Sequence, residues 1–169
     1  MSVLLVLAAV GVGLGATLLM DLWAWLLRRA FNIASLDYCL LGRWISYMPS
    51  GVFTHGSIAE APRKGRECRL GWFAHYQIGV LFALVLLLPA FEGWFFAPTL
   101  APAMAIGLVT ALIPFCLMQP ALGFGLASSK APRPWFARLK TLTTHAVFGL
   151  GLYLGALPVS YLLVAFAST

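Results

Sequence analysis

The sequence predicts an all-α, polytopic membrane protein in which four transmembrane helices form a bundle. Hydrophobic residues make up 62% of the 169 residues and charged residues only 9%, whereas roughly a quarter of the residues in soluble domains are charged. Four apolar stretches are each long enough to cross about 30 Å of hydrocarbon. All eleven Lys and Arg residues lie outside these stretches. The chain has room for a single transmembrane domain over residues 1–169.

We expect the spans at residues 3–27, 70–91, 100–118 and 142–166. The first span lacks the basic segment and the clear cleavage site of a signal peptide, so we interpret it as a retained helix. Residues 92–98 join the second and third spans without any basic residue, whereas the long connections 28–69 and 119–141 contain all of them. Two helical hairpins would follow from this spacing.

A weak repeat accompanies the hairpins. Leu19-Met20-Asp21 in the first span is similar to Leu117-Met118-Gln119 in the third, and His75-x-x-x-Gly79 in the second is similar to His145-x-x-x-Gly149 in the fourth. An axis along the membrane normal would relate two such hairpins.

The distribution of positive charge predicts the orientation of the chain. Basic connections are retained in the cytoplasm, so both termini would face the periplasm of a bacterial inner membrane, N-out and C-out. The basic residues lie beside the membrane spans, so contact with anionic lipid headgroups, worth roughly 1 kcal/mol per residue, explains them better than nucleic-acid binding. The residues that we expect at the headgroups are Arg28, Arg29, Arg69, Lys130, Arg138 and Lys140.

The first connection is long enough to hold a short cytoplasmic helix. Ser35 is a suitable N-cap, and apolar residues at helical spacing continue to Met48, so this helix would lie on the membrane surface. Cys39 and Cys68 would then face the reducing cytoplasm and Cys116 would lie within a span. We therefore expect no disulfide.

Four polar side chains, one from each helix, would lie in the cytoplasmic third of the bilayer: Asp21, His75, Gln119 at the end of the third span, and His145. Asp21 lies seven residues before Arg28, about 10 Å along a helix. A carboxylate at mid-membrane costs about 2.5–3.5 kcal/mol on insertion scales, which suggests a role for it. Small residues share the helical faces of these groups and allow close packing: Gly13 and Thr17, Gly71 and Gly79, Gly107 and Ala111, and Gly149 and Ala156. We expect the polar groups, with Thr17, to converge inside the bundle.

Several roles fit this polar layer. It could bind a small ligand or an ion, with Asp21 as the titrating group and the histidines as proton relays. His75 and His145 could be axial haem ligands, or they could bind a divalent metal together with Asp21. The layer could also fix helix register in an accessory or assembly subunit of a larger complex. A glycine face on the helices would separately allow a homodimer. No pattern in the sequence indicates a hydrolase.

Several short segments together resemble a known family. They are Met20-Asp21-Leu22-Trp23, Gly42-Arg43-Trp44, Gly71-Trp72 with His75-Tyr76 and Gly79, Gln119-Pro120, Pro132-Arg133-Pro134-Trp135, and His145 through Tyr153. The combination resembles bacterial membrane proteins catalogued as domain of unknown function 2938 and covers nearly the whole chain. The resemblance implies a single inner-membrane domain. It implies no activity and no site residues.

Overall fold

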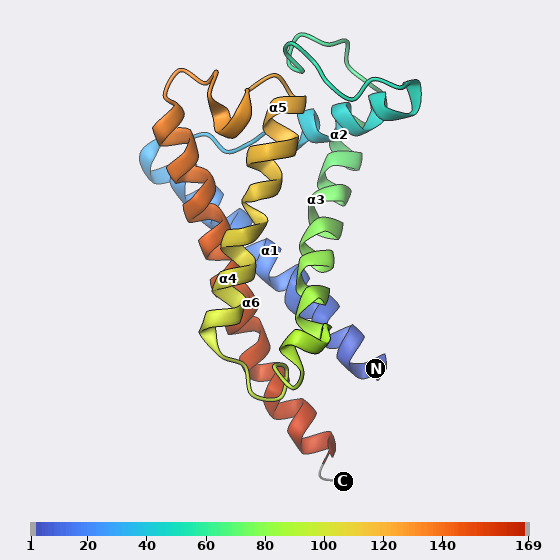
Figure 1. The fold of residues 1–169 in the computed structure, drawn as a ribbon, viewed down its shortest axis with the longest axis vertical. Helices are drawn as coiled ribbons and strands as arrows, with labels where there is room; N and C mark the ends of the chain where they lie inside the picture. The colour runs from blue at the N-terminus through green and yellow to red at the C-terminus, as the bar shows by residue number, and fades with distance from the viewer. Residues whose placement is uncertain (1–2, 168–169) are drawn as a thin grey trace.

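The computed structural model describes residues 3–167, in which four helices are long and apolar enough to cross a membrane (Figure 1). They are α1 (Val3–Phe31), α3 (Glu67–Leu84, extended by a 3-10 turn to Leu87), α4 (Leu100–Thr110, continued to Ala121 by a π-helical turn and the short α5, Gln119–Ala121) and α6 (Pro134–Ala167). The predicted fold class, an all-α membrane protein with four spans, is confirmed.

The helix ends differ from the predicted spans. Helix α1 runs four residues beyond residue 27, and α6 begins eight residues before residue 142, because charged residues can continue a helix into the interface. Helix α3 and its 3-10 turn end at Leu87 rather than at residue 91, where Pro89 has no N–H group to continue the helix.

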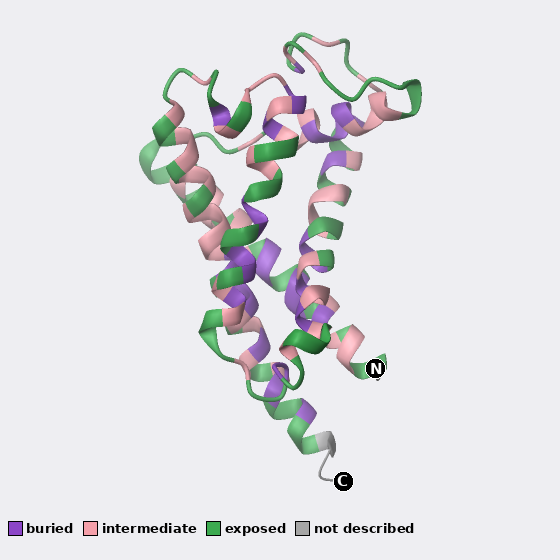
Figure 2. Cartoon of the chain, viewed as in Figure 1, coloured by how far each residue is buried: buried purple, intermediate pink, exposed green. Residues whose placement is uncertain are grey.

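The four long helices pack as two hairpins. Helix α1 packs against α3, and α4 packs against α6, while α1 and α6 join the two pairs. Figure 1 shows α3 and α4 diverging from the loop that connects them. A core of small and aliphatic residues, including Ala9, Ala16, Leu152 and Ala156, fills the junction of the helices, and Figure 2 shows buried residues concentrated there.

Glycines bring the helices of each hairpin into backbone contact. A Cβ on Gly107 would lie 2.6 Å from the Cα of Gly149, and a Cβ on Gly13 would lie 2.8 Å from the Cα of Val80. A threonine accompanies each contact. The hydroxyl of Thr17 donates to the carbonyl of Gly13 at 2.8 Å, and that of Thr110 donates to the carbonyl of Gly107 at 2.6 Å.

The predicted short helix is present as α2 (Tyr38–Tyr47), but its start and its environment differ from the expectation. The N-cap is Asp37 rather than Ser35, because the Asp37 carboxylate accepts a hydrogen bond from the amide of Cys39 at 2.8 Å. The buried face of α2 packs on protein rather than on lipid. Its Leu41 and Trp44 join a second core with residues of both basic connections: Ile58, Ala121 and Leu122.

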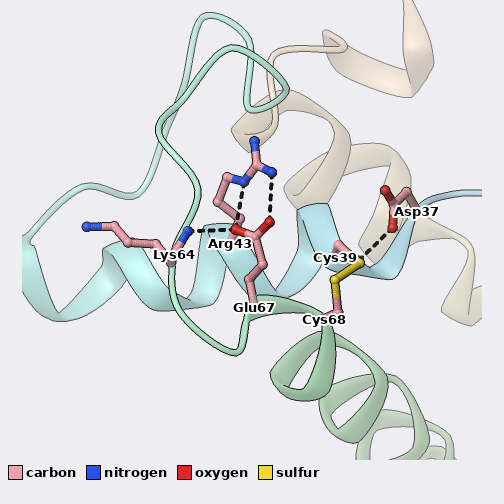
Figure 3. The surroundings of a disulfide bond; sticks show 6 residues. All are labelled: Asp37, Cys39, Arg43, Lys64, Glu67 and Cys68. Atoms are coloured by element: carbon pink, nitrogen blue, oxygen red, sulfur yellow. Dashed lines mark hydrogen bonds and ion pairs between the residues drawn. A yellow bond between two sulfur atoms is a disulfide. The ribbon is translucent and has the colours of Figure 1, made fainter.

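A buried ion pair fixes α2 to α3 (Figure 3). Arg43 Nε donates to Glu67 Oε2 at 2.9 Å, and its Nη2 donates to Oε1 at 2.8 Å, in a bidentate arrangement. The Nη1 group donates to three carbonyls of the first connection, those of Ile58, Ala59 and Ala61. Hydrogen bonding to Glu67 raises the pKa of Arg43 above its usual value. The pair therefore stays charged and organises the whole connection.

The expectation that no disulfide forms is wrong, because Cys39 of α2 and Cys68 of α3 are joined (Figure 3). The two cysteines meet because α2 and α3 approach each other closely. A Cβ on Gly42 would overlap the carbonyl oxygen of Glu67, and a Cβ on Gly71 would overlap that of Tyr38. This backbone contact places the two sulfur atoms together, which reasoning about compartment alone could not reveal.

Replacing Gly107 by Ala should destabilise the second hairpin by about 1–3 kcal/mol, because the new methyl group would overlap the backbone of Gly149. Gly11→Ala is the matched control, since a Cβ on Gly11 meets nothing within 4 Å. Unfolding of both variants in detergent micelles measures the difference. Equal stability of the two variants would contradict this packing.

Arg43→Ala should destabilise the protein by about 3–5 kcal/mol, because it leaves the Glu67 carboxylate buried without its charge partner. Arg69→Ala removes an exposed arginine two residues from Glu67 and should change stability by less than about 0.5 kcal/mol. Thermal unfolding in the same micelles compares the two. A loss of stability in Arg69→Ala without one in Arg43→Ala would contradict the stabilising role of the Arg43–Glu67 ion pair.

Candidate functional site

The structure places Asp21 of α1 beside two side chains from other helices. Its Oδ1 atom lies 3.0 Å from Nε2 of His75 on α3 and accepts a hydrogen bond from the hydroxyl of Tyr38 on α2 at 3.3 Å. The ring of Tyr38 stacks on that of His75, with 4.0 Å between the ring centroids. The carboxylate, imidazole and phenol thus form one hydrogen-bonded cluster that ties three helices together.

The chemistry of the partners fixes the direction of these hydrogen bonds. A carboxylate only accepts, so His75 Nε2 carries the proton that is shared with Asp21. Burial raises the pKa of Tyr38, and the charge of Asp21 raises it further, so its hydroxyl remains a donor. The other oxygen of Asp21, Oδ2, is buried without a hydrogen bond, although Tyr76 is near enough to interact with the carboxylate.

A cavity of about 490 Å³, which we call the main cavity, lies between the two hairpins and extends to the basic connections. Four of the polar residues singled out in the sequence border it: Thr17, His75, Gln119 and His145. Asp21 does not itself border the main cavity, but its partners His75 and Tyr38 do. The rest of the wall is largely apolar and includes Leu41, Phe82, Ile113 and Phe148.

His145 is held by a threonine rather than by an acidic residue. Its Nδ1 atom lies 3.0 Å from Oγ1 of Thr110 on α4. That hydroxyl already donates its single proton to the carbonyl of Gly107, so it accepts from His145, and Nδ1 carries the hydrogen. In the neutral imidazole, Nε2 is then the atom with a free lone pair.

Gln119 lies at the end of a distorted helical segment. Pro114 cannot donate a backbone hydrogen bond, and residues Pro114–Met118 form a π-helical turn directly before Gln119. Turns of this kind are frequent at functional sites. Gln119 is only 7% exposed, and its Oε1 is buried without a hydrogen-bond partner. A polar atom in this state indicates that a partner is missing.

The residues considered for metal or haem are only partly brought together. Asp21 and His75 are in contact, and His145 borders the same main cavity. Within residues 3–167, no group of three or more His, Cys, Asp and Glu side chains is arranged to hold a metal ion. Each histidine keeps one ring nitrogen without a hydrogen bond, since the other nitrogen bonds to Asp21 or Thr110.

The residues expected at lipid headgroups fall into two groups. Four are exposed: Arg28, Arg29, Arg69 and Lys130. The other two make bonds within the protein. Arg138 Nε donates to the carbonyl of Ala127 at 2.8 Å, and Lys140 Nζ donates to that of Ala34 at 2.7 Å. Lys140 also borders the main cavity.

Sequence reasoning missed two residues of this site, Tyr38 and Thr110. Both act through residues that were identified, since Tyr38 binds Asp21 and Thr110 binds His145. Of these two residues, only Thr110 could have been identified from its local sequence, because it is a polar residue one turn after Gly107 in an apolar helix. The position of Tyr38 depends on the packing of α2 against α3.

A smaller cavity of about 290 Å³ lies at the opposite end of the bundle, beside the loop that joins α3 to α4. Its wall is mainly apolar and aromatic, with Glu92 as the acidic residue among Phe91, Trp94 and Phe95. The polar groups of the four spans do not reach it, so the main cavity is the candidate site.

Comparison with known proteins identifies a family. The model of a family described as "Protein of unknown function (DUF2938)" matches residues 10–159, which include most of each span, the disulfide and every residue of the candidate site. No curated protein and no solved structure matches the chain. The match covers most of the chain, and the protein belongs to the DUF2938 family.

Proposed function

We propose that this protein binds a small amphipathic molecule in the main cavity. The observation that carries the proposal is a cavity of about 490 Å³ bordered by Gln119, a residue whose side chain makes no hydrogen bond within the described part of the chain. Cavities that bind small molecules typically measure about 300–1,000 Å³ and combine an apolar wall with a few polar groups. The main cavity has both properties, and a bound molecule would supply the partner that Gln119 lacks.

The residues that line the main cavity suggest where the apolar and polar parts of such a molecule would bind. Phe82, Ile113 and Phe148 would contact an apolar body, because they line the part of the main cavity that lies within the spans. His75, Gln119 and His145 would bind polar atoms. Asp21 would act through His75, holding the imidazole in one orientation and one tautomer.

We also propose that the basic connections face the cytoplasm of a bacterial inner membrane and that the main cavity opens toward them. The eleven Lys and Arg residues support this orientation, and exposed Arg28, Arg29, Arg69 and Lys130 would contact anionic headgroups. The Cys39–Cys68 disulfide would be unusual on that side, because cytoplasmic thiols are normally kept reduced.

Gentle purification from native membranes, followed by mass spectrometry of small molecules, tests the ligand proposal. Wild type should retain a compound that the variant Ala137→Trp retains at least tenfold less, since Ala137 lines the main cavity and the indole would occupy part of it. Gln119→Leu should also lose the compound. Gln77→Leu, the same change at an exposed position outside the main cavity, should keep it.

Equal recovery from wild type and Ala137→Trp would contradict the proposal. So would recovery of a larger protein complex without any small molecule, which would favour an accessory subunit.

Thiol labelling in intact cells tests the orientation. In a background with Cys39→Ser, Cys68→Ser and Cys116→Ser, a cysteine placed at exposed Lys130 should react only with a membrane-permeant maleimide. A cysteine placed at exposed Ala97, in the loop between α3 and α4, should react with an impermeant maleimide as well. The reverse pattern of labelling would contradict the proposed orientation.

A further inference from the structure

The four long helices surround the main cavity as an incomplete ring. Helix α1 packs against α3 and α6, and α6 packs against α4. Glycines bring each of these pairs into backbone contact. Gly13 does so between α1 and α3, Gly107 between α4 and α6, and Gly151 between α6 and α1, where a Cβ would lie 2.8 Å from the Cα of Ala16. In the described part of the chain no glycine brings α3 against α4, and Figure 1 shows these two helices diverging. The ring is therefore closed on three sides and open on the fourth.

Apolar side chains stand at this open side, which we call the α3–α4 opening. Ile78 of α3 and Ile113 of α4 both line the main cavity, yet they are 37% and 44% exposed. Their neighbours Leu81 and Leu117 are also exposed but do not line the main cavity. Such side chains are stable in a bilayer, because lipid tails are as apolar as leucine. At the depth of the spans, the α3–α4 opening would lead into hydrocarbon rather than into water.

The main cavity extends along the helices for about the depth of one leaflet. Phe148 lines it eleven residues after Ala137 on α6, which corresponds to about 16 Å along a helix. The hydrocarbon core of a bilayer is about 30 Å thick, so the main cavity covers roughly half of it. A cavity of this length and direction is parallel to the acyl chains around it.

The polarity of the wall changes along the same direction. Ser35, Ser128 and Lys140 line the main cavity at the basic end, and the residues farthest from that end are Phe82 on α3 and Phe148 on α6. A bilayer leaflet changes in the same order, from polar headgroups at its surface to hydrocarbon at its centre.

We propose that the main cavity opens sideways into the bilayer between α3 and α4, and that its ligand is a membrane lipid with one acyl chain inside. The chain would enter through the α3–α4 opening without leaving apolar surroundings. A water-soluble molecule would instead have to pass the two connections that border the basic end. This inference rests on the proposed function, because it names the class of the bound molecule and its route of entry.

Photocrosslinking from a lipid chain tests the inference. The probe is phosphatidylglycerol with a diazirine near the end of one acyl chain, mixed into phosphatidylglycerol nanodiscs that contain the protein. Tandem mass spectrometry of the digested protein locates the adducts. We expect adducts on Thr144 and Phe148, which line the main cavity. Val109 of α4 is exposed and does not line the main cavity, so its adducts measure contact with the surrounding lipid.

Two matched pairs of variants test the route of entry. Ile78→Trp and Ile113→Trp each place an indole at the α3–α4 opening. Each should lower the adducts on the two cavity residues at least fivefold, relative to those on Val109. Leu81→Trp and Leu117→Trp add the same bulk outside the main cavity and should leave this ratio unchanged.

The outcomes separate this inference from the proposed function. Adducts on Val109 without any on Thr144 or Phe148 would overturn the lipid assignment. Cavity adducts that both variants at the opening leave unchanged would overturn the route. In either case the proposed function stands if purified wild type retains a compound that Ala137→Trp loses. Absence of both the cavity adducts and such a compound would overturn the two proposals together.

Discussion

The carboxylate of Asp21 constrains the structure more than any other group in the spans. A charge within an apolar helix is tolerated when it turns away from lipid toward a polar partner. Asp21 does so by contacting His75 on α3 and Tyr38 on α2. These contacts set the rotation of α1 against α3 and place α2 across the end of the first hairpin. One wall of the main cavity is therefore a consequence of how a single charge is paired.

The wall of the main cavity formed by α4 and α6 contains no acidic residue equivalent to Asp21. In the second hairpin, Gly107 and Gly149 bring α4 and α6 into contact, and Thr110 holds His145. A threonine hydroxyl can serve two partners at once, since it donates to Gly107 and accepts from His145. The two hairpins touch through α1 and α6, so α3 and α4 are free to diverge. The main cavity occupies the space between them, and the π-helical turn before Gln119 forms part of its wall.

The two connections pack against each other, and parts of both border the main cavity at the basic end. The amide groups of His55 and Ile58 in the first connection donate to the carbonyls of Ala121 and Leu122 at 2.8 and 3.1 Å. Arg43 gathers the same connection by donating to its carbonyls while it pairs with Glu67. Arg43, a basic residue that the charge pattern would place at the membrane surface, is thus 5% exposed and holds the first connection together.

The sequence by itself determined the four spans, their hairpin order and the polar residues within them, because a chain in lipid must be apolar over about 20 residues and most of its polar side chains must find partners. Only the tertiary structure decided which partners they found. The Asp21–His75 contact, the Thr110–His145 contact and the Cys39–Cys68 pair all join residues from different helices. Such contacts depend on helix rotation and on backbone approach at Gly42 and Gly71. Periodicity places a residue on a face of its helix, but it does not determine what packs against that face.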